Sequence, residues 1–274
     1  MKKIGFLYIA FGIKYIKEAI FSAKSLRKFH PDASITIITD RQIDSDLFSK
    51  EVIKPSNKSY VDKIKYMRES PYEKTMFLDT DTYICDKIGS VFGLLKYFDV
   101  CMATEIGRPL FKDLPEGFED HKEFNTGVIL FNNNSKVQKL FELWEKTFET
   151  RKHLDSHDQP SMAIALAYSD VKFGVLPNEY NVRAIYPEVL SREVTIIHAR
   201  LRDYQKTLKK LNKNSDMARN WLPASMECIP IYGNALTKLW LGIKSVLSPA
   251  VNKVRSKLGL QGDLILPGKG RFEE

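Results

Sequence analysis

Apolar residues in the first two hundred positions alternate between short β-branched runs and segments with helical spacing. Residues 4–11 have the pattern of a buried strand, and 34–39 form a second run that is richer in β-branched side chains. Between them, the apolar side chains of 14–29 recur every three or four residues, as on one face of an amphipathic helix. The three segments therefore predict a right-handed strand–helix–strand unit with parallel strands.

The same two patterns continue along the chain. They predict strands at 75–78, 100–103, 127–131 and 194–197, and helices at 61–70, 89–97, 135–151 and 159–168. Glycine, proline and many charged residues in 105–122 predict a mobile loop. Such alternation is typical of the α/β class. We therefore expect a mostly parallel open sheet with a Rossmann-like nucleotide-binding half and a crevice at the carboxyl ends of its strands.

The pattern changes in the last quarter of the chain. Between residues 232 and 258, apolar residues return at helical spacing, and five Lys/Arg occupy other positions of the same segment. This predicts one or two basic amphipathic helices. We therefore divide the chain into a catalytic domain at 1–205 and a basic C-terminal extension at 206–274. The helices either pack on the catalytic domain or lie on an anionic bilayer.

The formal net charge of +8 is unevenly distributed. Residues 198–257 hold twelve Lys/Arg and three Asp/Glu, so this segment accounts for the basic surplus. A basic surface suits an anionic partner, such as a diphosphate, a lipid surface or a nucleic acid. Aromatic residues are sparse in this segment and it carries no nucleic-acid-binding motif, so we expect no nucleic acid partner.

Cysteine usage and hydropathy bear on the compartment. The three cysteines are widely spaced and odd in number, which favours a reducing compartment over a secreted disulfide framework. No stretch approaches the roughly 18 apolar residues that a spanning helix needs. We expect a cytoplasmic protein, with association at the cytoplasmic face of a membrane as the alternative.

The candidate chemistry begins with Asp79-Thr80-Asp81, which follows directly on the strand predicted at 75–78. Two carboxylates at alternate positions of an extended exit are able to direct oxygens at one divalent cation. Mg²⁺ and Mn²⁺ prefer such oxygen ligands and complete their shell with substrate phosphates. An acidic pair of this kind also occurs in turns and helix caps, so the pattern alone leaves both interpretations open.

Glu73 through Tyr83 resembles the DxD segment of GT-A-fold glycosyltransferases. The chain is most similar to the glycogenin/galactosyltransferase-like group and the nucleotide-diphospho-sugar transferases. Four further stretches match in order and rough spacing: Phe6 to Ala10 with Ser22 to Asp32, Phe124 to Val128, Asp158-Gln159, and Ile196 to His198. The resemblance covers about residues 1–205. The family's His-x-x-Gly-x-x-Lys run is incomplete here, because the glycine after His198 is missing.

The resemblance implies a role for each matching residue. The implied metal ligands, for Mn²⁺ or Mg²⁺, are Asp79, Asp81 and His198. The implied catalytic residues are Asp158 and Gln159. The implied nucleotide-sugar-binding residues are Tyr8, Ala10, Asp40, Lys63, Asp79, Thr80, Asn125, Thr126, Gly127 and Arg200. Structural alternatives stay open for several of them: a core tyrosine at Tyr8, a cap or turn at Asp40 and Asp158, and a core or cap histidine at His198.

The resemblance implies transfer of a sugar from a nucleotide-diphosphate donor, a UDP-sugar, to an acceptor hydroxyl of a glycan, a lipid-linked sugar or a protein. It favours retention of the anomeric configuration. One alternative is a nucleotidyltransferase that makes the sugar nucleotide, although only Gly12 stands where such enzymes carry a glycine-rich phosphate loop. A basic module that binds nucleic acid without catalysis is the second alternative.

The membrane alternative for residues 232–258 makes a direct prediction. If this segment binds an anionic bilayer, the full-length chain co-sediments with anionic liposomes, and a chain that ends before residue 232 does not. Added salt weakens the binding, because it screens the attraction between Lys/Arg and anionic lipid. Equal co-sedimentation of the two chains contradicts this prediction and favours packing on the catalytic domain.

Overall fold

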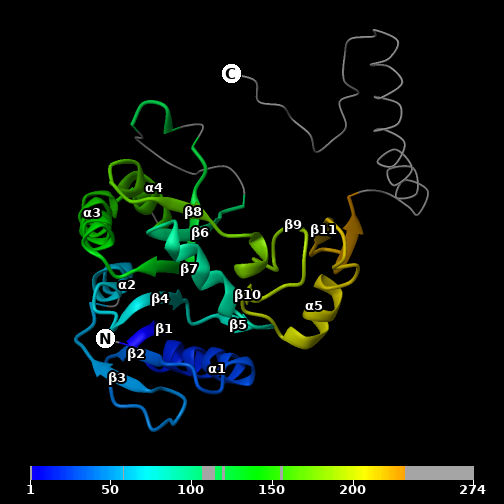
Figure 1. The fold of residues 1–274 in the computed structure, drawn as a ribbon, viewed down its shortest axis with the longest axis horizontal. Helices are drawn as coiled ribbons and strands as arrows, with labels where there is room; N and C mark the ends of the chain where they lie inside the picture. Colours follow the sequence, from blue (N-terminus) through cyan, green and yellow to red (C-terminus); the bar gives the residue numbers. More distant parts are fainter. Residues whose placement is uncertain (1, 58, 107–114, 119–120, 155–156, 232–274) are drawn as a thin grey trace. The chain divides into compact units, whose positions relative to one another are not determined.

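The computed structural model describes residues 2–57, 59–106, 115–118, 121–154 and 157–231 (Figure 1). Residues up to Ile229 belong to one compact unit, and a second unit begins at Pro230. The amphipathic helices predicted at 232–258, and most of the loop predicted at 105–122, lie outside the described residues. No described helix is long and apolar enough to cross a lipid bilayer.

A seven-stranded sheet forms the centre of the first unit (Figure 1). In spatial order its strands are β3 (Lys50–Ile53), β2 (Ile35–Thr39), β1 (Lys2–Ala10), β4 (Tyr72–Leu78), β7 (Phe124–Asn132), β6 (Val100–Thr104) and β8 (Phe173–Val175). The first four strands are parallel to one another. β7 is antiparallel to both of its neighbours, and β8 runs parallel to β6. The predicted mostly parallel α/β sheet is therefore confirmed.

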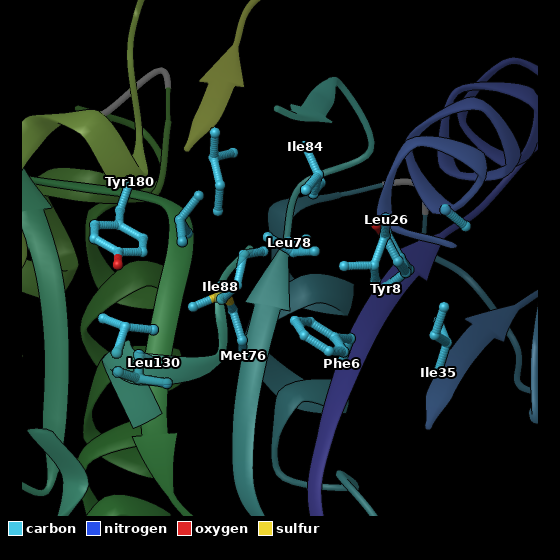
Figure 2. Close-up of a cluster of buried hydrophobic side chains, with 14 of the residues drawn as sticks. Phe6, Tyr8, Leu26, Ile35, Met76, Leu78, Ile84, Ile88, Leu130 and Tyr180 are labelled. Carbon is cyan, nitrogen blue, oxygen red and sulfur yellow. The ribbon is translucent and has the colours of Figure 1, made fainter. Parts of the chain in front are cut away.

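Helices cover both faces of this sheet. They are α1 (Ile13–Phe29), α2 (Tyr60–Met67), the 3₁₀ helix η1 (Gly89–Lys96), α3 (Ser135–Arg151) and α4 (Gln159–Ala167). One buried cluster joins the sheet to α1 and η1, and a second joins it to α2, α3 and α4. Because successive side chains of a strand point to opposite faces, β1 contributes to both clusters. Figure 2 shows Phe6 and Tyr8 of β1 in the first cluster, near Leu26 of α1 and Met76 and Leu78 of β4.

The described residues also form two smaller sheets, one with two strands and one with three. β5 (Thr82–Ile84) pairs antiparallel with β10 (Ile196–His198), and the register places His198 opposite Thr82. The other small sheet has the order β12 (Glu227–Pro230), β11 (Arg219–Leu222) and β9 (Glu188–Leu190). The 3₁₀ helix η3 (Asn178–Tyr180) and the helix α5 (Tyr204–Leu211) complete the described elements.

The buried side chains around these smaller sheets form a third cluster, which includes Trp221. Its indole donates a 2.8 Å hydrogen bond to the carbonyl oxygen of Ala184. Arg219 is fully buried, and its guanidinium donates to the carbonyl oxygens of Leu211 and Arg192 at 2.7 and 2.9 Å. The buried charge is thus bonded to backbone acceptors rather than to a carboxylate.

A close contact in the sheet centre predicts a sensitive position at Gly5. A methyl group added there would lie 2.4 Å from the ring of Tyr72, whose hydroxyl shares a 2.7 Å hydrogen bond with Thr36. We expect Gly5→Ala to lower the free energy of unfolding by about 1–3 kcal/mol, because overpacking forces the ring to shift. Urea denaturation measures this. Gly93→Ala is the matched control, since nothing lies within 4 Å of its Cβ, and equal effects of the two changes would refute the prediction.

Candidate functional site

A cavity of about 1240 Å³ opens at the carboxyl edge of the parallel strands. Its wall includes residues just beyond β1, β2 and β4, among them Phe11, Asp40 and Asp79. The antiparallel strand β7 presents its amino end to the same edge and contributes Thr126 and Gly127. This is where the sequence predicts a nucleotide crevice, and the volume is ample for a nucleotide-sized ligand.

Most of the candidate residues from the sequence meet at this cavity. Eleven of the fourteen line it: Asp40, Lys63, Asp79, Thr80, Asp81, Thr126, Gly127, Asp158, Gln159, His198 and Arg200. The other three are Tyr8, Ala10 and Asn125, which are almost fully buried behind the wall. Asn125 still contacts lining residues, because its amide donates to the carboxylate of Glu105 at 2.6 Å.

Tyr8 occupies the core rather than the cavity wall. Its side chain is fully buried, and its hydroxyl shares a 2.9 Å hydrogen bond with Ser22 of α1. Burial raises the pKa of the Tyr8 hydroxyl well above its ordinary value. Tyr8 and Ala10 share the face of β1 that packs against α1, so neither is placed to contact a base in the cavity. The opposite face of β1 and the residues after it bring Ile9 and Phe11 to the wall instead.

Asp79, Asp81 and His198 converge at one side of the cavity. One donor atom from each lies within 4.8 Å of the other two. The Nε2 atom of His198 is 3.3 Å from a carboxylate oxygen of Asp81 and 3.7 Å from one of Asp79. Two carboxylates and one imidazole suit Mn²⁺ or Mg²⁺ in type and number, with positions left for substrate oxygens. The residues present therefore fit a divalent cation.

The backbone explains how residues so distant in sequence reach one point. The turn after β4 is closed by the amide and the hydroxyl of Thr82, which donate to the carbonyl oxygen of Asp79 at 3.2 and 2.8 Å. The amide of Asp79 donates to the carbonyl oxygen of Gly127 at 2.7 Å. The pairing of β5 with β10 then brings His198 alongside this turn.

Gly127 makes room for the imidazole. A Cβ atom at this position would lie 2.0 Å from Cε1 of His198, so no larger residue fits while the ring stays in place. The resemblance implies a role for Gly127 in the wall around the donor sugar. The structure adds a separate reason for a glycine here, since the backbone of β7 and the ring of His198 are in direct contact.

Lys63 is the central cation of the site. Its ammonium group lies 3.0 Å from the carboxylate of Asp158 and 3.4 Å from that of Asp79, and it donates to the Thr126 hydroxyl at 3.1 Å. Burial lowers the pKa of the Lys63 ammonium, but the two carboxylates outweigh it and raise the pKa above its ordinary value. Lys63 therefore stays charged and compensates two acids that would otherwise repel each other.

The two carboxylates of the DxD pair have different environments. Burial raises the pKa of the Asp79 carboxyl, and the charge of Lys63 offsets this only in part. Burial also raises the pKa of Asp81, but His198 and Arg200 outweigh it and hold that pKa far below its usual range. Arg200 approaches Asp81 to 2.9 Å and also pairs with Glu18 of α1 at 2.8 Å.

Two more lining residues that the resemblance implies in donor binding, Thr80 and Asp40, are held by hydrogen bonds to neighbouring groups. The hydroxyl of Thr80 donates to the carboxylate of Glu18 at 2.9 Å. Asp40 accepts a 3.3 Å hydrogen bond from the amide of Gly12 and pairs with Arg41 at 2.9 Å. The Arg41 hydrogen bond is the main reason that the pKa of the Asp40 carboxyl is lowered.

Glu105 is a lining residue that the sequence interpretation missed. One of its carboxylate oxygens accepts hydrogen bonds from Asn125 at 2.6 Å, Gln159 at 2.9 Å and Arg183 at 2.8 Å. Burial raises the pKa of Glu105, but Arg183 and the amide donors outweigh it and lower that pKa. The sequence does contain a signal for Glu105, because this residue directly follows β6, and β6 ends at the same edge of the sheet as β4.

The open α/β sheet, with an acidic pair and a histidine at its carboxyl edge, defines a GT-A-type fold. The model of the nucleotide-diphospho-sugar transferase family matches residues 74–213, slightly more than half of the chain. The chain therefore belongs to this family of glycosyltransferases, as the motifs in the sequence indicate. A comparison with curated proteins gave no match.

Two solved glycosyltransferase structures are similar to this chain to different degrees. The glycosyltransferase GlyE of Streptococcus pneumoniae TIGR4 is 15% identical over 67% of this chain and 48% of its own, with a TM-score of 0.52. This chain thus spans about half the length of GlyE. The galactosyltransferase LgtC, in complex with donor and acceptor sugar analogues, is 16% identical over 65% of this chain and 74% of its own, with a TM-score of 0.45.

Proposed function

We propose that this protein transfers a sugar from a nucleotide-diphosphate sugar, a UDP-sugar by resemblance, to an acceptor hydroxyl with the help of Mn²⁺ or Mg²⁺. The observation that carries this proposal is the convergence of Asp79, Asp81 and His198 at the wall of a nucleotide-sized cavity. Membership of the nucleotide-diphospho-sugar transferase family supports the donor class. The acceptor is proposed to be a glycan, a lipid-linked sugar or a protein.

The reaction requires that negative charge be stabilised as it grows on the departing diphosphate. A divalent cation, when bound, neutralises part of that charge. Arg200 borders the same side of the cavity, and half of its side chain is exposed, which supports a proposed contact with a phosphate oxygen. Lys63 lies deeper and holds Asp79 and Asp158 in fixed positions, which keeps the binding geometry rigid before substrate arrives.

The acceptor side of the proposed reaction centres on Asp158 and Gln159 at the start of α4. Asp158 is buried, and its carboxylate is engaged by Lys63 at 3.0 Å and by the Thr126 hydroxyl at 3.1 Å. Lys63 and Thr126 thus fix this carboxylate in place, which favours a positioning role for it. We therefore propose that Asp158 and Gln159 orient the sugar, and that the acceptor attacks from the face that the diphosphate leaves, with retention.

We also propose different functions for two parts of the chain. Residues 1–205 would supply catalysis and 206–274 a basic extension whose segment 232–258 contacts the cytoplasmic face of a membrane. This is a functional division, because residues 206–229 pack within the first compact unit. The basic surplus of residues 198–257 is what supports it.

A panel of nucleotide sugars with Mn²⁺ or Mg²⁺, assayed for released nucleoside diphosphate, tests the proposed function. We expect activity with at least one donor, loss of activity with a chelator, and a fall in kcat/KM on the order of 100-fold or more for Asp81→Asn. Asp86→Asn is the matched control, since Asp86 follows β5 outside the cavity and its carboxylate accepts from the Lys87 amide.

Two outcomes would contradict the proposed function. One is activity that neither the chelator nor Asp81→Asn reduces. The other is release of pyrophosphate from a nucleoside triphosphate and a sugar 1-phosphate, which would identify a nucleotidyltransferase.

A further inference from the structure

Buried side chains connect Glu105, which lines the cavity, with His198 through a chain of hydrogen bonds, here called the relay. The carboxylate of Glu105 accepts from the amide nitrogen of Asn125 at 2.6 Å. The amide oxygen of Asn125 accepts from the amide nitrogen of Asn181 at 2.8 Å. The amide oxygen of Asn181 lies 2.9 Å from Nδ1 of His198. Asn125, Asn181 and His198 are each less than a tenth exposed, so water does not compete for these bonds.

The orientation of the side-chain amides in this relay is set at Asn125. A carboxylate only accepts hydrogen bonds, so Asn125 must turn its NH₂ group toward Glu105. The backbone amide of Gly127 only donates, and it lies 2.9 Å from the oxygen of Asn125. Two neighbours of opposite type therefore fix the orientation of the same amide. Arg183 and the backbone amide of Ile106 also donate to Glu105, which confirms its carboxylate as an acceptor.

The orientation of the Asn125 amide in turn determines the orientation of the Asn181 amide. Because its oxygen faces Asn181, Asn181 must present its NH₂ group there and turn its own oxygen toward His198. An amide oxygen only accepts, so Nδ1 of His198 must carry the proton. The neutral ring then has its lone pair on Nε2, which points between Asp79 and Asp81.

We propose that Asn181 is a positioning residue that holds His198 in the tautomer with its proton on Nδ1, so that Nε2 is free to bind a divalent cation. This inference rests on the proposed role of the site as a metal site. Two carboxylates and a ring lone pair that face one another repel unless a proton or a metal ion lies between them, so a neutral ring held in this tautomer leaves the site ready for a metal ion. A metal-bound histidine ordinarily donates its other ring N–H to such an acceptor.

The position of the ring has separate supports. The backbone amide of Val182 donates to the carbonyl oxygen of Ile196 at 2.9 Å. The backbone amide of His198 donates to the carbonyl oxygen of Val182 at 2.8 Å. The ring also packs against Gly127. Removal of the Asn181 side chain therefore leaves these backbone bonds in place and changes chiefly the acceptor for the proton. This separation makes the proposal testable.

The experiment combines two measurements on the full chain. In metal-free protein with ¹⁵N-labelled histidine, at a pH at which the ring is neutral, NMR shifts identify which ring nitrogen of His198 carries the proton. Electron paramagnetic resonance then gives the Kd for Mn²⁺. Asn181→Ala removes the acceptor. Asn178→Ala is the matched control on the same short segment, because its amide donates to the carbonyl oxygen of Val189 and not to the relay.

We expect the proton on Nδ1 in the wild type and in Asn178→Ala, and a mixed or Nε2-protonated ring in Asn181→Ala. The Kd for Mn²⁺ should rise about 10–100-fold in Asn181→Ala and stay unchanged in Asn178→Ala. Asn181→Asp keeps an acceptor for Nδ1 but loses the donor to Asn125. It should therefore keep the wild-type tautomer and bind Mn²⁺ more tightly than Asn181→Ala does.

Three results would overturn the proposal: an Nε2 proton in the wild type, a wild-type tautomer and Kd in Asn181→Ala, or equal losses in Asn181→Asp and Asn181→Ala. The last would indicate that Asn181 acts only through its bond to Asn125. A wild type that binds no Mn²⁺ would refute the metal role of the site, and the NMR measurement would still decide the tautomer.

Discussion

The pairing of two very short strands is the constraint on which the site depends. β5 follows the acidic turn directly, and β10 ends on His198, so their antiparallel register sets the imidazole beside Asp79 and Asp81. Neither strand exceeds three residues, and neither belongs to the central sheet. Their buried side chains, among them Ile84 and Ile197, join two different hydrophobic clusters. Packing on both sides therefore holds together three side chains that the repulsion between the two acids alone would drive apart.

Charge compensation is the second requirement of this arrangement. The cavity brings Asp79, Asp81 and Asp158 close together, and partial burial makes each uncompensated charge costly. Lys63 compensates two of these acids from within, and Arg200 compensates Asp81 from the more exposed side. Another carboxylate that lines the cavity, that of Glu105, is paired with Arg183. The wall is thus ordered before substrate binds, which reduces the free energy that binding must spend on ordering.

Much of the fold follows from periodicity along the chain. The β-branched runs at β1 and β2 and the helical spacing of α1 are strong, local signals, and the structure confirms them. Other elements have weak signals, because β5, β8, β9 and β10 are three residues long and depend on partners far away in sequence. The segment 89–97 was predicted as a helix, and it forms the 3₁₀ helix η1.

The candidate site also contains residues that the sequence predicts and residues that it does not. The acidic pair at the end of an apolar strand is visible in the sequence, and so is the histidine at the end of another. For Tyr8 the structure favours the core alternative, because the two-residue period of β1 sends Tyr8 into the core and leaves Ile9 at the cavity wall. The contribution of Asn181 could not be predicted from the sequence, because its two side-chain partners, Asn125 of β7 and His198 of β10, are brought together only in the folded chain.

The central claim is that Asp79, Asp81 and His198 hold a divalent cation that also contacts the diphosphate of the donor. Anomalous diffraction from crystals that contain Mn²⁺ and a nucleoside diphosphate tests it most directly. The account predicts one manganese peak bonded to all three side chains and to diphosphate oxygens within the cavity. A nucleotide bound in this cavity with manganese elsewhere, or with no manganese at these residues, would contradict it.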